Sequence, residues 1–322
     1  MTTRPPLSGI HHITAIAGAP QPNLDFYCGT LGLRMVKRSV NQDDPGTFHL
    51  YYGDAAGSPG SLLTFFPWSG ARAGHRGPGQ VTVVAFAVPP DALDFWTDRL
   101  AHHGVSHLPP KPRFGETVLP FADPDGLPIE LVAAAGDARA PWPDGPVPAD
   151  VAIRGLHSAT ILAGSDSRTA RFLTDVLEFR PAQTDGGRAR FETGTGGGGA
   201  IVDVVTSDRG TARGGGGAGT VHHIAWRVAD DAAQEAWRAA AEAAGRQPTP
   251  VVERFYFRSV YFREPGGVLY ELATDGPGFA VDEPPEALGE RLALPPWLEP
   301  QRAAIEAALP PIQLPQQPGT LA

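Results

Sequence analysis

The sequence predicts an α+β fold of four βαβββ modules, arranged as a tandem duplication of a two-module half. Two sets of internal matches support this prediction. The segment GIHHITAI at 9–16 matches GLHSATIL at 155–162, at an offset of 146 positions. The segment VTVVAFAV at 81–88 matches VHHIAWRV at 221–228, at an offset of 140 positions. Self-similarity at a fixed spacing is typical of repeated structural units, so each half is expected to contain two modules.

Each module is expected to contain a strand, then a helix, then further strands. In the first module, HHITAIA alternates as a strand does, and PQPNLDFYCGTL has the pattern of a helix that ends near Gly32. FHLYYGD and SLLTFFPW follow as β-rich segments. In the fourth module, the Ala-rich DDAAQEAWRAAAEAAG is the clearest helix, and Gly245 stands where it should stop. Trp96 and Trp237 occupy equivalent places in the helices of the second and fourth modules.

The modules divide the chain into three parts. The N-terminal half is predicted to span 1–148, and the C-terminal half 149–280. Residues 281–322 form a Pro-rich tail with one short helix, LEPQRAAIEAAL, which we expect to wrap the body or cover a site. The predicted modules lie at 9–68, 80–133, 154–206 and 219–275.

The composition is that of a globular enzyme or binding protein. The 322 residues are 42% hydrophobic, and the formal net charge of −9 comes without a block of Lys or Arg. No nucleic-acid partner is expected, because phosphate binding needs a basic face. Cys28 is the only cysteine, which excludes a disulfide framework and a thiolate zinc site. The first residues lack the apolar segment of a signal peptide, and no window approaches about 18 apolar residues, so we expect a cytoplasmic protein without a membrane span.

The βαβββ repetition resembles the vicinal oxygen chelate superfamily, which includes glyoxalases, bleomycin resistance proteins and dioxygenases. The resemblance extends over nearly all of the four modules. It implies that modules pair to form cup-shaped mixed sheets. It also implies that a metal ion lies in the cup, held by side chains from the first and last strands of the modules.

The repeat alignment identifies one complete ligand set on those strands. A site for divalent iron or manganese requires two neutral imidazoles and one carboxylate. Pairing the first module with the second, or the third with the fourth, leaves the site one imidazole short. Pairing the first with the fourth supplies His12, His223 and Glu271, which we predict as the metal ligands. The aligned positions are His12, Val83, Ser158 and His223 on the first strands, and Thr64, Glu130, Asp203 and Glu271 on the last.

Two observations qualify this ligand set. A single histidine in a strand more often packs than binds a metal, but two HH doublets at equivalent positions favour the metal. Because neighbouring side chains on a strand point to opposite faces, His11 and His222 are expected to face away from the site. An alternative set of His157, His223 and Glu271 would follow from a one-residue slip of the first strand in the third module.

Longer motifs resemble the ring-cleaving dioxygenases that open hydroquinones. These motifs are GIHHIT, VHHIAW, RFYFRSVYFREPGGVLYELATDGPGF and LPPWLEPQR. The resemblance implies a dioxygenase of the extradiol type that takes a small hydroquinone-like or catecholic substrate and O2. The implied metal is Fe(II), with Mn(II) as the alternative. The ligands carried over are again His12, His223 and Glu271.

The same resemblance assigns five neighbours of the metal. Arg254 and Tyr261 would bind the substrate and take part in catalysis, and Thr14 would bind the substrate. His11 and His222 would move protons or, as the alternative, support the ligands from behind.

Two other functions share the fold. A glyoxalase or isomerase would usually carry a fourth protein ligand, but Thr64 occupies the position of the second carboxylate. A non-catalytic binding protein would sequester a small molecule without a metal, and the retained His, His, Glu set argues against it. The sequence leaves a homo-oligomer open.

Two further features are expected to be structural. The Gly-rich segments at 193–204 and 213–219 lack the helix or the Lys-Ser/Thr of nucleotide-binding loops, so we expect flexible loops or connectors. Asp43 and Asp44 are expected to be turn residues rather than ligands.

Overall fold

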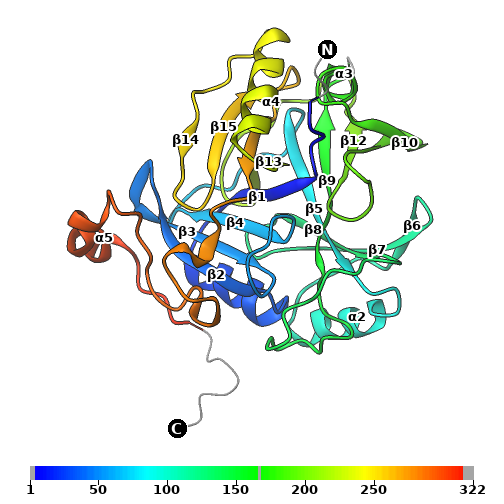
Figure 1. Cartoon of the computed structure of the whole chain (residues 1–322). Helices are drawn as coiled ribbons and strands as arrows, with labels where there is room; N and C mark the ends of the chain where they lie inside the picture. Colours follow the sequence, from blue (N-terminus) through cyan, green and yellow to red (C-terminus); the bar gives the residue numbers. More distant parts are fainter. Residues whose placement is uncertain (1–3, 166–167, 315–322) are drawn as a thin grey trace.

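The computed structural model describes residues 4–165 and 168–314, which form two eight-stranded mixed sheets (Figure 1). The strands of the first sheet are β1 (Ile10–Ala17), β2 (Arg34–Asn41), β3 (Asp44–Gly53), β4 (Leu62–Pro67), β13 (Thr220–Val228), β14 (Val252–Glu253), β15 (Arg258–Arg263) and β16 (Leu269–Thr274). The strands of the second sheet are β5 (Gln80–Val88), β6 (Lys111–Arg113), β7 (Glu116–Ala122), β8 (Pro128–Ala133), β9 (Gly155–Ala163), β10 (Arg180–Asp185), β11 (Arg188–Glu192) and β12 (Ile201–Thr206).

Short helices connect the strands. The α-helices are α1 (Pro20–Leu24), α2 (Leu93–His102), α3 (Arg168–Asp175), α4 (Asp231–Ala243) and α5 (Arg302–Ala308). A π-helical turn, η1 (Asp25–Thr30), extends α1, and the tail contains three 3-10 turns, η2 (Phe279–Val281), η3 (Pro285–Ala287) and η4 (Glu299–Gln301). No helix among the described residues is long and apolar enough to cross a membrane.

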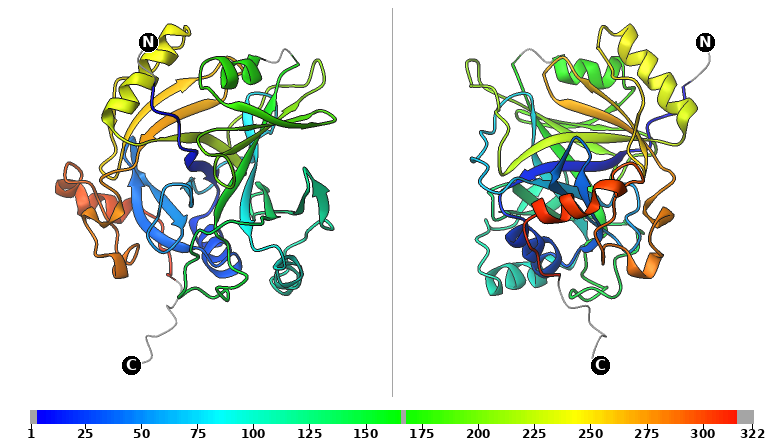
Figure 2. Two further views of the ribbon diagram at one scale, coloured as in Figure 1. Left: turned by 45° about the vertical axis from the view of Figure 1, so that its right-hand side comes forward. Right: turned by 90° about the vertical axis from the view of Figure 1, so that its left-hand side faces the viewer.

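Each sheet combines modules from different halves of the chain. The first sheet has the order β14-β15-β16-β13-β1-β4-β3-β2, so the fourth module pairs with the first. The second sheet has the order β10-β11-β12-β9-β5-β8-β7-β6, so the third module pairs with the second. Both sheets curl, as Figure 2 shows. The predicted fold of four modules in cup-shaped sheets is confirmed, and so is the pairing of the first module with the fourth.

Two equivalent tryptophans show the duplication in three dimensions. Trp96 in α2 and Trp237 in α4 are both fully buried. The indole Nε1 of Trp96 donates to the carbonyl oxygen of Val151 at 2.8 Å, and that of Trp237 donates to Pro5 at 2.9 Å. Each acceptor precedes the first strand of the partner module, so both helices attach to their sheets by the same contact.

The tail lies along the edge of the first sheet (Figure 2). Lys37 in β2 is fully buried, and its ammonium group contacts the carboxylates of Asp282 and Glu283. It also donates to the carbonyl oxygen of Phe279 at 3.2 Å. A buried ammonium group without partners would be costly, so these contacts hold the start of the tail against β2. Residues 315–322 of the predicted tail lie outside the described residues.

Candidate metal centre

Three neighbouring strands of the first sheet bring His12, His223 and Glu271 together. The strands are β1, β13 and β16, which lie side by side in the sheet. The two Nε2 atoms of the histidines are 3.3 Å apart. Oε2 of Glu271 lies 3.2 Å from Nε2 of His12 and 2.9 Å from Nε2 of His223. All three side chains are buried, and their donor atoms lie within 4.8 Å of one another.

These residues fit a divalent metal ion. Two imidazole nitrogens and one carboxylate form the donor set of non-haem iron sites, and manganese accepts such donors too. Ser259 donates to the other carboxylate oxygen of Glu271 at 2.5 Å, which leaves Oε2 facing the imidazoles. Burial lowers the pKa of His223 and favours the neutral, metal-binding form. Burial alone would raise the pKa of Glu271, yet the two imidazoles beside it hold that pKa well below its ordinary value.

Both histidine doublets contain a β-bulge. On β1, Ile10 pairs with Trp226 and His12 with the adjacent Ala225, so His11 is the extra residue. A bulge leaves its extra residue unpaired and turns its side chain. His11 therefore does not point to the face opposite His12, as strand alternation predicted, but contacts the His12 ring from behind the site.

On β13 the same irregularity occurs at the second doublet. Thr14 pairs with His223 and Ala15 with Val221, so His222 is the extra residue. The prediction that His222 faces away from the site is wrong, because its ring turns toward that of His223.

The outer histidines bond to the ligand histidines. Nδ1 of His11 lies 2.9 Å from Nδ1 of His12, and Nδ1 of His222 lies 2.8 Å from Nδ1 of His223. If Nε2 of each ligand binds a metal, its only proton is on Nδ1 and is donated to the outer histidine. Burial, and then the adjacent imidazole, lowers the pKa of both His11 and His222 to about 3. Both outer rings are therefore neutral and accept this hydrogen bond at Nδ1.

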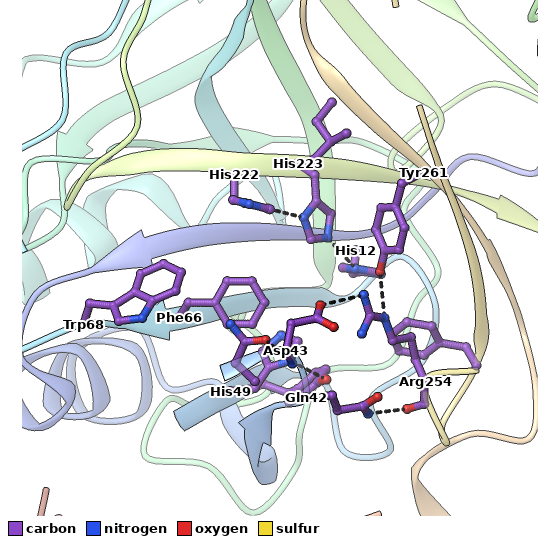
Figure 3. A pocket seen from close by; sticks show the side chains of 14 residues that line it. His12, Gln42, Asp43, His49, Phe66, Trp68, His222, His223, Arg254 and Tyr261 are labelled. Atoms are coloured by element: carbon purple, nitrogen blue, oxygen red, sulfur yellow. Dashed lines mark hydrogen bonds and ion pairs between the residues drawn. The ribbon is translucent and has the colours of Figure 1, made fainter. Parts of the chain in front are cut away.

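A cavity of about 290 Å³ opens beside His12 and His223 (Figure 3). Arg254 lies between two partners at its wall: its Nε donates to Oη of Tyr261 at 3.2 Å, and its Nη2 contacts Asp43 at 3.0 Å. Burial alone would lower the pKa of Arg254, but Tyr261 and Asp43 raise it above its ordinary value. Burial raises the pKa of Tyr261, which keeps its hydroxyl protonated. The lining residues are His12, Asn41, Gln42, Asp43, His49, Tyr51, Phe66, Trp68, His222, His223, Arg254, Phe257, Tyr261 and Leu269.

The cavity separates the predicted neighbours into two groups. Arg254, Tyr261 and His222 line its wall. His11 and Thr14 are not part of the wall among the described residues; both are buried behind it. Any action of His11 or Thr14 on a molecule in the cavity must therefore pass through another side chain.

A hydrogen-bonded chain that sequence reasoning missed runs along β3, β4 and β1. The hydroxyl of Tyr51 lies 2.7 Å from Nδ1 of His49, and Nε2 of His49 lies 2.9 Å from Oγ1 of Thr64. Thr64 in turn contacts Oγ1 of Thr14 at 2.8 Å. Burial lowers the pKa of His49 well below its ordinary value, so the ring is neutral and one of its nitrogens accepts.

The repeat contained a signal for this chain. Tyr51 pairs with Thr64 across β3 and β4 as Tyr261 pairs with Glu271 across β15 and β16. Comparing the third strands of the modules would have placed Tyr51 opposite Tyr261, with His49 two residues away. Asp43 was expected to be a turn residue, and its contact with Arg254 had no local signal.

The alternative ligand set is not formed. His157 lies on β9 in the second sheet, whereas His223 and Glu271 lie in the first. Nε2 of His157 is 2.8 Å from Glu116, and its Nδ1 is 3.0 Å from Ser158.

Comparisons with known proteins agree with this architecture. The Glyoxalase/Bleomycin resistance protein/Dioxygenase superfamily model matches residues 9–131 and 155–272. A Bacillus subtilis protein named "Putative ring-cleaving dioxygenase MhqO" is 46% identical over 95% of this chain and 97% of its own. The chlorohydroquinone/hydroquinone 1,2-dioxygenase of Sphingobium indicum is 36% identical over 91% of this chain and 93% of its own.

Solved structures show the same fold. A crystal structure from Bacillus subtilis superposes with a TM-score of 0.91 at 45% identity, over 96% of this chain and 99% of that one. Glyoxalase I from Zea mays gives a TM-score of 0.60 at 17% identity, over 83% and 92%, which shows a shared fold alone. The family model and the near full-length relatives place this chain in the Glyoxalase/Bleomycin resistance protein/Dioxygenase superfamily.

Proposed function

We propose that this protein is a metal-dependent, ring-cleaving dioxygenase of the extradiol type that opens a hydroquinone-like or catecholic ring with O2. The observation that carries the proposal is the buried set of His12, His223 and Glu271 at the base of an aromatic-walled cavity. The names of two relatives support ring cleavage, and one of them names hydroquinone. We propose Fe(II) as the metal and Mn(II) as the alternative. The cytoplasmic location stays a prediction.

His12, His223 and Glu271 would hold the metal, which would supply open coordination positions, lower the pKa of a bound phenol and allow O2 to bind beside it. The overall reaction adds both atoms of O2 and breaks one carbon–carbon bond of the ring. A hydroquinone without a carboxyl group thereby gives a product with one carboxylic acid and one aldehyde.

Arg254 and Tyr261 would hold the oxygen atoms of the substrate. The guanidinium of Arg254 keeps unused N–H donors at the cavity wall, and a charge-assisted hydrogen bond from it would stabilise a phenolate oxygen. Tyr261 stays protonated and would donate its hydroxyl hydrogen to a second oxygen. Their mutual contact at 3.2 Å fixes both groups on one side of the cavity.

His222 would donate a proton at Nε2. Its Nδ1 is occupied by the bond to His223, so the proton of the neutral ring lies on Nε2. Because His222 lines the cavity, that N–H can donate to an oxygen in it. His11 has the same bond to His12 but no access to the cavity, so we propose it as a positioning residue. Thr14 would act similarly, through Thr64.

The aromatic wall suits a flat ring. Phe66 and Trp68 lie with ring centroids 5.5 Å apart on one side. Phe257 packs against His12 with a centroid distance of 5.2 Å. Aromatic surfaces favour offset or edge contacts with another ring, so a small aromatic substrate would be held by its faces while polar groups orient its oxygens.

The competing functions fit the site less well. A glyoxalase or isomerase with four protein ligands would need a donor at Thr64, whose hydroxyl already bonds to Thr14 and His49. In a binding protein without a metal, the buried carboxylate of Glu271 would lack a cation to balance its charge, and a buried charge without a partner is costly.

Metal analysis combined with oxygen uptake tests the proposal. We expect purified protein loaded with Fe(II) or Mn(II) to consume O2 with at least one member of a panel of hydroquinones and catechols. His12→Ala should remove metal and activity, and His157→Ala, which changes a buried histidine on β9 of the second sheet, should keep both. Absence of oxygen uptake by metal-loaded protein across the panel, or full activity of His12→Ala, would overturn the proposal.

A further inference from the structure

A second cavity, of about 320 Å³, shares a wall with the first. Both cavities are lined by His222, His223 and Leu269. The remaining wall of the second comes from the ends of β1, β5, β13 and β15, from the β4–β5 and β12–β13 connectors, and from the turn between β15 and β16; it includes Arg213 and Arg263. A molecule formed above the metal ligands therefore has a neighbouring space of similar size on the far side of His222.

The glycine-rich connector 213–219 forms part of this cavity and is not a free loop. His75 and Gly215 exchange two backbone hydrogen bonds, at 2.9 and 2.7 Å. A Cβ atom added to Gly217 would lie 2.6 Å from the carbonyl oxygen of Arg72, so only glycine allows this close approach. The expectation of a flexible connector is corrected. Residues 213–219 pack against the connector between β4 and β5, through Arg72 and His75, and this packing fixes the position of Arg213.

Two guanidinium groups converge at this cavity. Nη2 of Arg213 donates to the carbonyl oxygen of Gly266 at 2.9 Å, and Nη1 of Arg263 donates to that of Gly267 at 2.9 Å. Adjacent carbonyls of one turn thus anchor both arginines. Neither guanidinium lies within 4.0 Å of an acidic side chain among residues 4–165 and 168–314. Each arginine has five N–H donors, so most remain available.

The two cavities differ in their balance of charge. In the first, Arg254 is paired with Asp43 at 3.0 Å. In the second, both charged lining residues besides the histidines are arginines, and no carboxylate lines it among the described residues. Such a lining favours the binding of an anion in the second cavity.

We propose that the second cavity is an anion-binding subsite that receives the carboxylate of the ring-opened product through Arg213 and Arg263. The inference rests on the proposed function. A hydroquinone without a carboxyl group is neutral, whereas its product carries a carboxylic acid that is ionised at neutral pH. Ring opening therefore creates a carboxylate beside His222. The two guanidiniums bind this carboxylate, so the product leaves the first cavity and the next substrate can enter.

Calorimetric titration of anaerobic, metal-loaded protein with cis,cis-muconate tests this subsite directly. We expect Arg213→Gln and Arg263→Gln each to weaken binding about fivefold, and the double variant about 20-fold, as for partly exposed charge pairs. Arg209→Gln is the matched control, because it removes a charge from the same β12–β13 segment, ahead of the connector and outside the cavity wall. The neutral dimethyl ester of muconate should bind equally to all variants.

Catalytic assays then separate the two proposals. If wild-type protein fails to open any ring, the proposed function fails and the titration still reports on the subsite. If wild-type protein opens hydroquinone but the variants bind muconate as wild type does, the subsite is overturned while the function stands. If the variants instead raise only the KM for 2,5-dihydroxybenzoate, the arginines serve a carboxylate on the substrate, and the product assignment is overturned.

Discussion

The guanidinium of Arg113 forms two hydrogen bonds, at 2.5 and 2.6 Å, with the carboxylate of Glu130 in the second sheet. Both residues precede their counterparts, Arg254 and Glu271, by 141 positions. At the positions of His12 and His223 the second sheet has Ser158 and Val83, which cannot replace the imidazoles as ligands. In the second sheet, Arg113 therefore neutralises the buried carboxylate of Glu130. In the first sheet, by contrast, the donor set around Glu271 fits a metal ion.

Removing Arg113 should destabilise the protein strongly. Both side chains of the pair are largely buried, at 10% and 7% exposure, so Arg113→Ala leaves the Glu130 carboxylate buried without its partner. Breaking a buried pair on one side costs about 3–5 kcal/mol. Urea unfolding should show this loss. Arg238→Ala, which breaks a solvent-exposed pair with Glu235 on α4, should change the free energy of unfolding far less. Equal losses in the two variants would contradict the prediction.

Replacing the two equivalent glutamates, Glu271 and Glu130, should have different effects on metal binding. We expect Glu271→Gln to lose metal, because the neutral amide removes the charged oxygen that faces both imidazoles. We expect Glu130→Gln to keep a full complement of one metal ion per chain, since its carboxylate is bound to Arg113. Elemental analysis of both variants beside wild type measures this directly. Two metal ions per wild-type chain, or loss of metal from Glu130→Gln, would refute the assignment of one site.

The repeat made most of this arrangement predictable. Equivalent positions on the first and last strands follow from constant offsets, and only one combination of modules supplied two imidazoles and a carboxylate. The bulges at His11 and His222 were not predictable, because an irregular hydrogen-bond register leaves no trace in an apolar–polar pattern. The contact of Asp43 with Arg254 joins residues 211 positions apart and depends on the curl of the first sheet. Local patterns carry no information about such a contact.

The outer histidines should differ in their kinetic effects. His11→Leu and His222→Leu each remove the Nδ1 acceptor of a ligand histidine, so each should weaken metal binding about 10–100-fold. With saturating metal, only His222→Leu should lower kcat about 100-fold or more, because of these two histidines only His222 lines the cavity, where we propose that it donates a proton. Metal titration followed by steady-state assays at saturating metal separates the two effects. An equal fall in kcat for His11→Leu would show that His11 also reaches the reacting atoms.

Asp123 should make stability depend on pH. Burial raises the pKa of its carboxyl group to about 6, despite hydrogen bonds from Tyr27 and from the backbone of Leu127. The folded state then binds this proton more tightly than the unfolded state, whose pKa is about 4. The stabilising contribution is complete below pH 4 and is lost as the pH rises through 6.

Asp123→Asn isolates this contribution, because the amide does not titrate. The free energy of unfolding of wild type relative to the variant should fall by about 2 kcal/mol between pH 4 and pH 7 and stay constant above that, at about 1.4 kcal/mol per pKa unit. Urea unfolding at each pH gives this difference, and other titrating groups cancel from it because they are shared. A difference that rises with pH would mean that the hydrogen bonds from Tyr27 and the backbone outweigh burial and hold the carboxylate ionised.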